Sequence, residues 1–182
     1  LHTILRRQRQ MCIRDSHKEL CDVSDWMYHN PELGFEEYET SKYLVNFIES
    51  KNAKVNYPSH NLDTAFDVTF GDSGPLVVLC VEYDALPEIG HACGHNIIAT
   101  ASIGAGLGLQ DLADDLGIRV KLLGTPAEEG GGGKIILLDN GAFEDAKCSM
   151  MIHPGYENVV NPTFTTIPVS YTHLTLPTKD GG

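Results

Sequence analysis

The run PLVVLCVEYD at residues 75–84 constrains the fold more than any other part of the sequence. It is nearly all apolar and rich in Val and Leu. A strand that is exposed on one face alternates apolar and polar residues, whereas a strand inside a parallel sheet is buried on both faces. The run therefore predicts a central strand of a parallel α/β sheet.

Helix-like and strand-like segments alternate along the rest of the chain. The patterns predict helices at 18–29, 39–52, 97–115 and 134–141, and further strands at 118–126 and 148–155. Strands that alternate with helices predict right-handed crossovers between parallel strands. We therefore expect an α/β fold in which a mostly parallel sheet carries helices on both faces.

A shorter β-rich run, FDVTF at 66–70, precedes the central strand and is separated from it by GDSG. A Gly-containing connection of this length between two β-rich runs is typical of a hairpin. We therefore expect residues 66–70 to pair directly with residues 75–84.

Charge and cysteine content exclude several classes of partner. The 182 residues carry a formal net charge of -12, which would repel nucleic acid and anionic membranes, so a small molecule or a dipeptide is the expected partner. No apolar run reaches the roughly 18 residues of a membrane helix. Five cysteines at irregular positions do not form the pattern of a disulfide framework, which favours a reducing, cytoplasmic location.

Polar clusters follow each of the three predicted parallel strands. GHACGHN comes after the first strand, TPAEEG comes after the second, and IHPG ends the third. The carboxyl ends of parallel strands meet at one edge of the sheet, where ligands bind. The side chains that we expect to meet there are Cys93, His95, Glu128, Glu129 and His153. Thiolate, imidazole and carboxylate groups together suit zinc or a similar divalent metal.

Each cluster also has a simpler explanation when it is taken alone. Cys93 and His95 could be a structural pair, Glu128 and Glu129 a solvated surface, and His153 a residue that ends a strand. Their joint placement at three successive strand ends favours the metal site.

The spacing within the clusters suggests how the groups divide the chemistry. In an extended loop, Cys93 and His95 point to the same side, whereas the adjacent Glu128 and Glu129 point apart. Glu129 can then bind the metal while Glu128 faces the bound water as a general base. A metal lowers the pKa of bound water to about 7, and a second ion would hold the attacking oxygen further. Glu128 would pass the water proton to the leaving amine, which predicts hydrolysis of an amide bond.

Three neighbouring residues have two interpretations each. Asp84 ends the first strand and either orients a ligating imidazole or bridges two metals, or else caps the strand. His91 and Asn96 lie beside the ligands and either support them or face substrate, or else pack within the loop.

Both ends of the chain look foreign to the fold. Residues 1–16 and 169–182 contain RRQRQMCIRDS and VSYTHLTLPT, which resemble translated sequencing-adapter read-through. We expect them to be a non-native leader and a non-native tail. The alternative is an ordinary polar tail at each end.

Four motifs together resemble the M20 family of metallopeptidases and amidohydrolases. They are MYHNPELGFEE, EYDALPEIGHACGHN, GTPAEEGGGG and IHPG, within a resemblance that runs from about residue 17 to residue 168. The Cys-Gly-His sequence is similar to a subgroup that includes the aminobenzoyl-glutamate hydrolases and carnosine-like dipeptidases. The resemblance implies a truncated zinc-exopeptidase-like catalytic domain.

The resemblance also implies a site with two divalent ions. The ligands would be Cys93, His95, Glu129 and His153, with Glu128 as the general acid and base. Members of the family use zinc, manganese, cobalt or nickel, and they cleave N-acyl amino acids or short dipeptide-like amides.

The sequence departs from the family pattern in two respects. Many Cys-Gly-His relatives have an aspartate where Asn96 stands, so this chain has a neutral group there that cannot act as a bridging carboxylate. Relatives also carry a lid or dimerisation domain and a further histidine ligand near the C-terminus. We therefore expect 17–160 to be a partial catalytic domain and 161–168 the start of that lid, through which the full-length protein would form a homodimer. With four of five ligands the chain would be an inactive fragment, and the alternative is a non-catalytic metal-binding or subunit-like protein.

Overall fold

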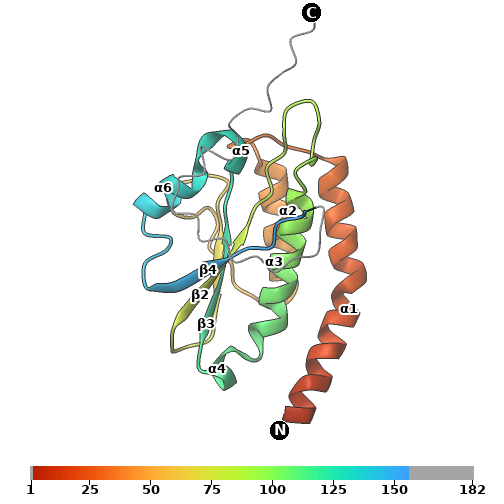
Figure 1. Cartoon of the computed structure of the whole chain (residues 1–182), viewed down its shortest axis with the longest axis vertical. Coiled ribbons are helices and arrows are strands. Elements are labelled where there is room, and N and C mark those ends of the chain that lie inside the picture. Colours follow the sequence, from red (N-terminus) through yellow and green to blue (C-terminus); the bar gives the residue numbers. More distant parts are fainter. Residues whose placement is uncertain (1, 156–182) are drawn as a thin grey trace, which may run out of the picture.

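The fold is built on a four-stranded mixed sheet (Figure 1). The computed structural model describes the backbone of residues 2–155 and the side chains of residues 16–155, so the predicted lid start at 161–168 and tail at 169–182 lie outside the described residues. The strands are β1 (Asp67–Phe70), β2 (Leu76–Val81), β3 (Arg119–Gly124) and β4 (Ala146–Met150), in the order β1-β3-β2-β4. β2 pairs in parallel with both β3 and β4, which confirms the predicted parallel centre of the sheet.

The predicted hairpin between residues 66–70 and 75–84 is wrong. β1 pairs antiparallel with β3, with Asp67 opposite Leu123, while both edges of β2 are occupied by parallel partners. The GDSG connection crosses the start of β3 instead of folding back on β1. A Cβ atom at Gly74 would lie 2.0 Å from the Gly117 carbonyl oxygen, so only glycine allows this close crossing.

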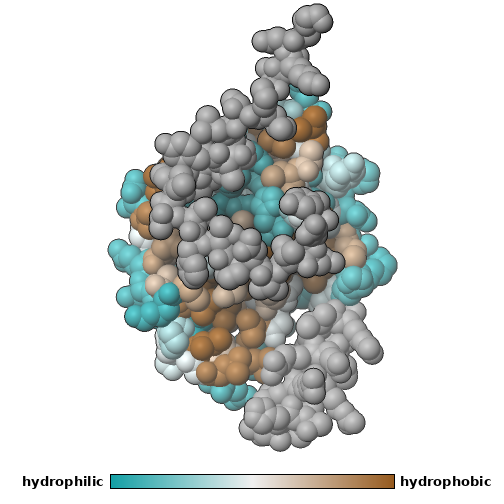
Figure 2. All heavy atoms as spheres, viewed as in Figure 1, coloured by the Kyte–Doolittle hydropathy of each residue, from teal (hydrophilic) through white to brown (hydrophobic). Residues whose placement is uncertain are grey.

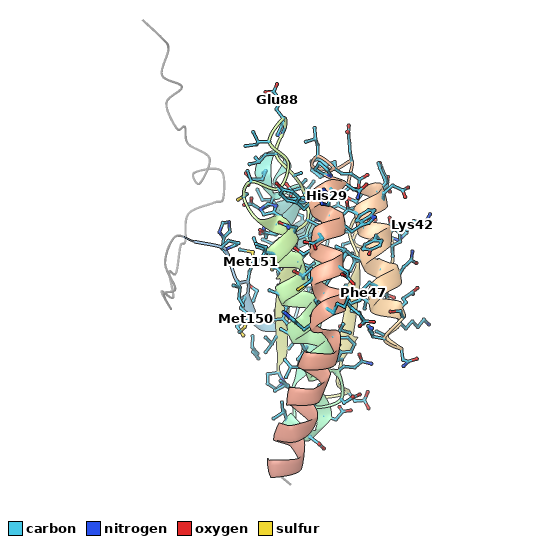
Figure 3. The ribbon with its side chains drawn as sticks, turned by 90° about the vertical axis from the view of Figure 1, so that its right-hand side faces the viewer. His29, Lys42, Phe47, Glu88, Met150 and Met151 are labelled. Atoms are coloured by element: carbon cyan, nitrogen blue, oxygen red, sulfur yellow. The ribbon has the colours of Figure 1, made fainter. Side chains whose placement is uncertain are left out.

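Helices cover both faces of the sheet, as expected. They are α1 (His2–His29), α2 (Tyr38–Glu49), α3 (His95–Gln110), α4 (Ala113–Leu116), α5 (Glu128–Gly131) and α6 (Gly133–Asp139). Figures 1 and 3 show α1, α2 and α3 side by side as one layer, while α6 lies across the sheet from them. None of the helices in the described part combines the length and apolar composition that crossing a bilayer requires.

The alternation of side chains along β2 produces two separate cores. Leu79 and Val81 face the helical layer and join the larger core with Ile103 of α3. Val78 and Cys80 face the opposite side and pack in a smaller core with Leu137 of α6 and with the other members of that cluster. An apolar residue at every position of β2 is therefore required by the two-sided burial that the sequence suggested.

Two predicted helix boundaries differ from the structure. α1 runs without a break through the predicted leader, so residue 16 does not mark the start of a helix, and the foreign origin of the leader stays a prediction. The predicted helix 97–115 is divided into α3 and α4, because the chain turns at Leu112 and buries Leu112 and Ala113.

Replacement of Leu122 by Ala tests the larger core. Leu122 is fully buried on β3, so Leu122→Ala should lower the free energy of unfolding in urea by about 2–5 kcal/mol. Leu116→Ala is the matched control, because Leu116 is 49% exposed on α4 and its truncation should cost no more than about 0.5 kcal/mol. Equal losses in the two variants would contradict this core.

Candidate functional site

The structure brings three of the predicted ligands together beyond the carboxyl end of β2. The ligand atoms of Cys93, His95 and His153 all lie within 4.8 Å of one another, and the Cys93 Sγ is 3.5 Å from the His153 Nε2. This group lies near the end of the sheet at which α3 begins and α5 lies (Figure 1). Figure 2, in the view of Figure 1, shows a hydrophilic region near the centre of the visible face and a hydrophobic region below it.

A turn, and not an extended loop, brings Cys93 and His95 together. Gly94 has a left-handed backbone with φ +88°, and His95 is the first residue of α3. A Cβ atom at position 94 would lie 2.7 Å from the Pro154 side chain, next to His153. Gly94 therefore permits both the turn and the close approach of the segment that carries His153.

His95 is the centre of the polar network. Its side chain is fully buried, and its Nδ1 lies 3.0 Å from the Asp84 Oδ1 and 2.8 Å from the Asp84 carbonyl oxygen. Both partners are acceptors, so the hydrogen-bond network assigns the proton to Nδ1 and leaves the lone pair on Nε2. The Asp84 contact thereby sets the tautomer that a metal-ligating histidine needs.

Three carboxylates surround the Nε2 atom of His95. The distances are 3.4 Å to Glu82 Oε2, 3.7 Å to Glu129 Oε1 and 3.8 Å to Glu128 Oε2. Burial opposes a positive charge on this ring, but the hydrogen bond and charge of Asp84 and the charges of Glu82 and Glu128 outweigh it and raise the pKa of His95. The environment of Nε2 therefore favours a positive charge at this point.

The residues present fit a divalent cation. His95 Nε2 and Glu82 Oε2 are buried atoms that have no hydrogen-bond partner among the described residues. One cation bound by His95 would also offset the charge of Glu82, and the mixed nitrogen, oxygen and sulfur donors suit a first-row metal.

Glu82 is a site residue that the sequence analysis missed. It lies in the nearly apolar strand run, two residues before Asp84, so both acidic side chains leave the strand on the same side. The other Glu82 oxygen forms an ion pair with Lys134, which follows the glycine run. A buried acid in an apolar strand was the available signal, because such a charge needs a partner.

Asp84 has the contacts of the orienting alternative. Besides holding His95, its Oδ2 accepts the backbone N–H of Glu129 at 2.8 Å. Burial raises the pKa of Asp84, but the hydrogen bonds from His95 and from the backbone of Glu129 outweigh burial and lower it overall. Asp84 therefore stays ionised and connects two of the predicted ligands.

Glu128 and Glu129 do not have the extended backbone that was expected. They are the first residues of the short helix α5, and both carboxylates approach His95 instead of pointing apart. Burial is the main cause of the raised pKa of Glu128, and the charges of Glu82 and Glu129 add to it against the opposing effect of Lys134. A raised pKa suits a group that must accept and release a proton.

The Cys93 thiol needs a nearby positive charge in order to ionise. Burial and the neighbouring acidic groups, Glu129 first among them, raise the pKa of the Cys93 thiol to about 12. The thiol is thus protonated at neutral pH in the surroundings that the protein alone provides. A bound cation would reverse this balance and stabilise the thiolate.

The two remaining candidates from the sequence are Asn96 and His91. Asn96 donates a hydrogen bond to the Ser24 Oγ of α1 at 2.9 Å, and its role at the site stays a prediction. His91 is buried, and burial lowers its pKa to about 4, so its ring is neutral at pH 7. Its supporting or substrate-facing role stays a prediction.

Comparison with known proteins finds relatives among peptidases and amidohydrolases. The chain is 38% identical over 170 residues to the Xaa-Arg dipeptidase of Mus musculus, and this match covers 85% of the chain and 39% of the relative. It is 30% identical over 161 residues to one of the subunits of p-aminobenzoyl-glutamate hydrolase from Escherichia coli, covering 78% of the chain and 34% of the relative. No protein-family model matches the sequence.

A solved structure shares the fold. It is a Bacillus subtilis protein described as a dinuclear metal-binding peptidase from the M20 family, with a TM-score of 0.67 and 23% identity over 75% of this chain and 42% of that one. The chain thus spans about two fifths of the length of these relatives.

Metal binding provides a direct test of the assembled ligands. Zn²⁺ or Mn²⁺ should raise the thermal unfolding midpoint, because free metal at 100 times the dissociation constant adds about 2.7 kcal/mol to stability. Cys93→Ser should remove most of the Zn²⁺ effect, whereas Cys21→Ser, at an exposed position on α1, should leave it intact. An unchanged midpoint in wild-type protein at saturating metal would count against the site.

Proposed function

Because the chain is a homologue of M20-family peptidases and amidohydrolases, we propose that it takes part in the metal-dependent hydrolysis of an amide bond. The substrate class is a small N-acyl amino acid or a dipeptide-like amide. The single observation that carries the proposal is the buried His95 Nε2, which faces three carboxylates within 3.8 Å and has no hydrogen-bond partner among the described residues.

The proposed metal ligands are Cys93, His95, Glu129 and His153. Zinc or manganese is the preferred ion, cobalt and nickel are the alternatives, and two ions are expected per site, as in the dinuclear relative. When bound, the metal supplies a water of lowered pKa and polarises the substrate carbonyl. Proximity of the ligand atoms of Cys93, His95 and His153 supports this assignment.

The proposed proton carrier is Glu128. Its partly buried carboxylate lies 3.8 Å from the His95 Nε2, and its raised pKa suits it to take a proton from water and give it to the leaving amine. Asp84 holds the His95 ring and the Glu129 backbone, so it acts by orientation. Lys134 pairs with Glu82 and limits the negative charge that surrounds the reaction.

The proposal extends to the protein that contains this chain. We propose that residues 17–160 are part of a catalytic domain, that a further histidine ligand and a lid or dimerisation domain complete it, and that the whole protein is a cytoplasmic homodimer. On this view the 182 residues alone are inactive. Recovery of the neighbouring genomic sequence tests these points, because a complete gene without a further histidine ligand would contradict a two-metal enzyme.

Replacement of Glu128 tests the mechanism. In the product of the complete gene, Glu128→Gln should lower the rate of amine release from N-acetyl amino acids and Xaa-Arg dipeptides by about 10²–10⁴-fold. Metal content, measured by elemental analysis, should stay at the wild-type value. The control is Glu36→Gln, which changes an exposed carboxylate next to α2 and should keep full activity.

Two outcomes would contradict the proposal in different ways. Activity that survives both a metal chelator and Glu128→Gln would exclude the assigned base and the metal. Tight metal binding without turnover of any of these substrates would favour the non-catalytic metal-binding alternative.

A further inference from the structure

Glu37 is a fully buried acid that the hydrolytic site does not use directly. It stands at the N-cap position of α2, in the turn GFEE that links α1 to α2. None of the ion pairs found in the described part of the chain includes it. A buried carboxylate without a cation is costly, so its hydrogen bonds must account for its presence.

Those hydrogen bonds lead to the segment that carries Glu128 and Glu129. The Glu37 Oε1 accepts the backbone N–H of Ala127 at 2.7 Å, and its Oε2 accepts the Thr64 hydroxyl at 3.0 Å. Ala127 is also fully buried, and it directly precedes α5. A side chain 90 residues away in sequence thus supplies the partner for the last amide before the predicted base.

Ala127 needs this support because of its conformation. Its backbone is left-handed, with φ 55° and ψ 46°, which L-residues other than Gly, Asn and Asp seldom adopt. Ala127 lies between β3 and α5, so its conformation sets the direction in which α5 starts. Strained positions of this kind persist only where the surroundings hold them in place.

The Glu37 turn also packs against both ends of α5. A Cβ atom at Gly34 would lie 3.0 Å from the Ala127 Cα, and one at Gly131 would lie 2.1 Å from the Phe35 ring. From the other side, the Asp84 carboxylate holds the Glu129 backbone N–H. The short helix is therefore held at its start by Glu37 and at its second residue by Asp84.

We propose that Glu37 is a positioning residue, which fixes the left-handed turn at Ala127 and thereby places Glu128 and Glu129 beside His95. The inference rests on the proposed function, because it assumes that these two carboxylates serve a metal and its water. It adds a residue from the helical layer to a site whose other members follow the strands.

Four substitutions separate positioning from simple stability. Glu37→Gln keeps an oxygen for the Ala127 N–H, while Glu37→Met removes both acceptors and keeps a similar length. Thr64→Val removes the other hydrogen bond to Glu37 and leaves the Ala127 contact in place. Val45→Ala weakens the buried side of α2 without touching this network, so it serves as a control for loss of stability.

Zn²⁺ affinity of the 182-residue protein is the first measurement, by competition with a chromophoric chelator. Glu37→Met should weaken binding by about 10–100-fold, as expected when a group that supports metal ligands is removed. Glu37→Gln, Thr64→Val and Val45→Ala should stay close to the wild-type affinity. In the product of the complete gene, Glu37→Met should lower kcat more than it changes KM.

Amide hydrogen exchange of the metal-free protein is the second measurement. Glu37→Met should speed exchange at Ala127 and its neighbours in α5, and Glu37→Gln should restore slow exchange. If wild-type protein binds no metal or cleaves no substrate while this difference in exchange is seen, the proposed function fails and the positioning of α5 stands. The positioning role is overturned if Glu37→Met matches Val45→Ala in both metal affinity and exchange, or if Glu37→Gln behaves like Glu37→Met.

Discussion

The carboxylate of Asp84 is the interaction on which the site depends. One oxygen holds the Nδ1 of a fully buried imidazole at 3.0 Å, and the other accepts the backbone N–H of Glu129 at 2.8 Å. The first contact fixes the tautomer of His95, and the second fixes the start of α5 against the end of β2. A single side chain therefore joins the segments that follow two neighbouring strands, and every other group at the site is placed relative to these two.

The sheet explains why this arrangement is rigid. β2 is paired on both edges and buried on both faces, so the residues that follow it leave from a strand that is held on every side. Glu82 and Asp84 extend from that strand with the same side-chain alternation and point into the same polar region. Geometry that a metal requires within tenths of an ångström is easier to hold on such a strand than on a free loop.

Much of the fold and of the candidate site could be predicted from local patterns. The features that could not be predicted depend on contacts between residues far apart in the sequence. The parallel central strand and the meeting of Cys93, His95 and His153 followed from burial pattern and from the shared edge of parallel strands. The pairing of β1 with β3 could not be predicted, because the two edges of β2 are filled by strands much later in sequence. The left-handed backbone of Ala127 could not be predicted either, because it is supported by a glutamate 90 residues earlier.

The concentration of acid in this region bears on the proposed affinity for a divalent ion. Glu82, Asp84, Glu128 and Glu129 all lie within a few ångströms of one imidazole, and Lys134 forms an ion pair with Glu82. Like charges in a partly buried cluster repel strongly because the surrounding dielectric is low. Burial, with the neighbouring acidic groups, raises the pKa values of Glu128 and Cys93, and the hydrogen bond and charge of Asp84 raise the pKa of His95 against the effect of burial. A bound cation would favour the deprotonated form of each of these groups, so the acidic cluster would be the source of the proposed affinity for a divalent ion.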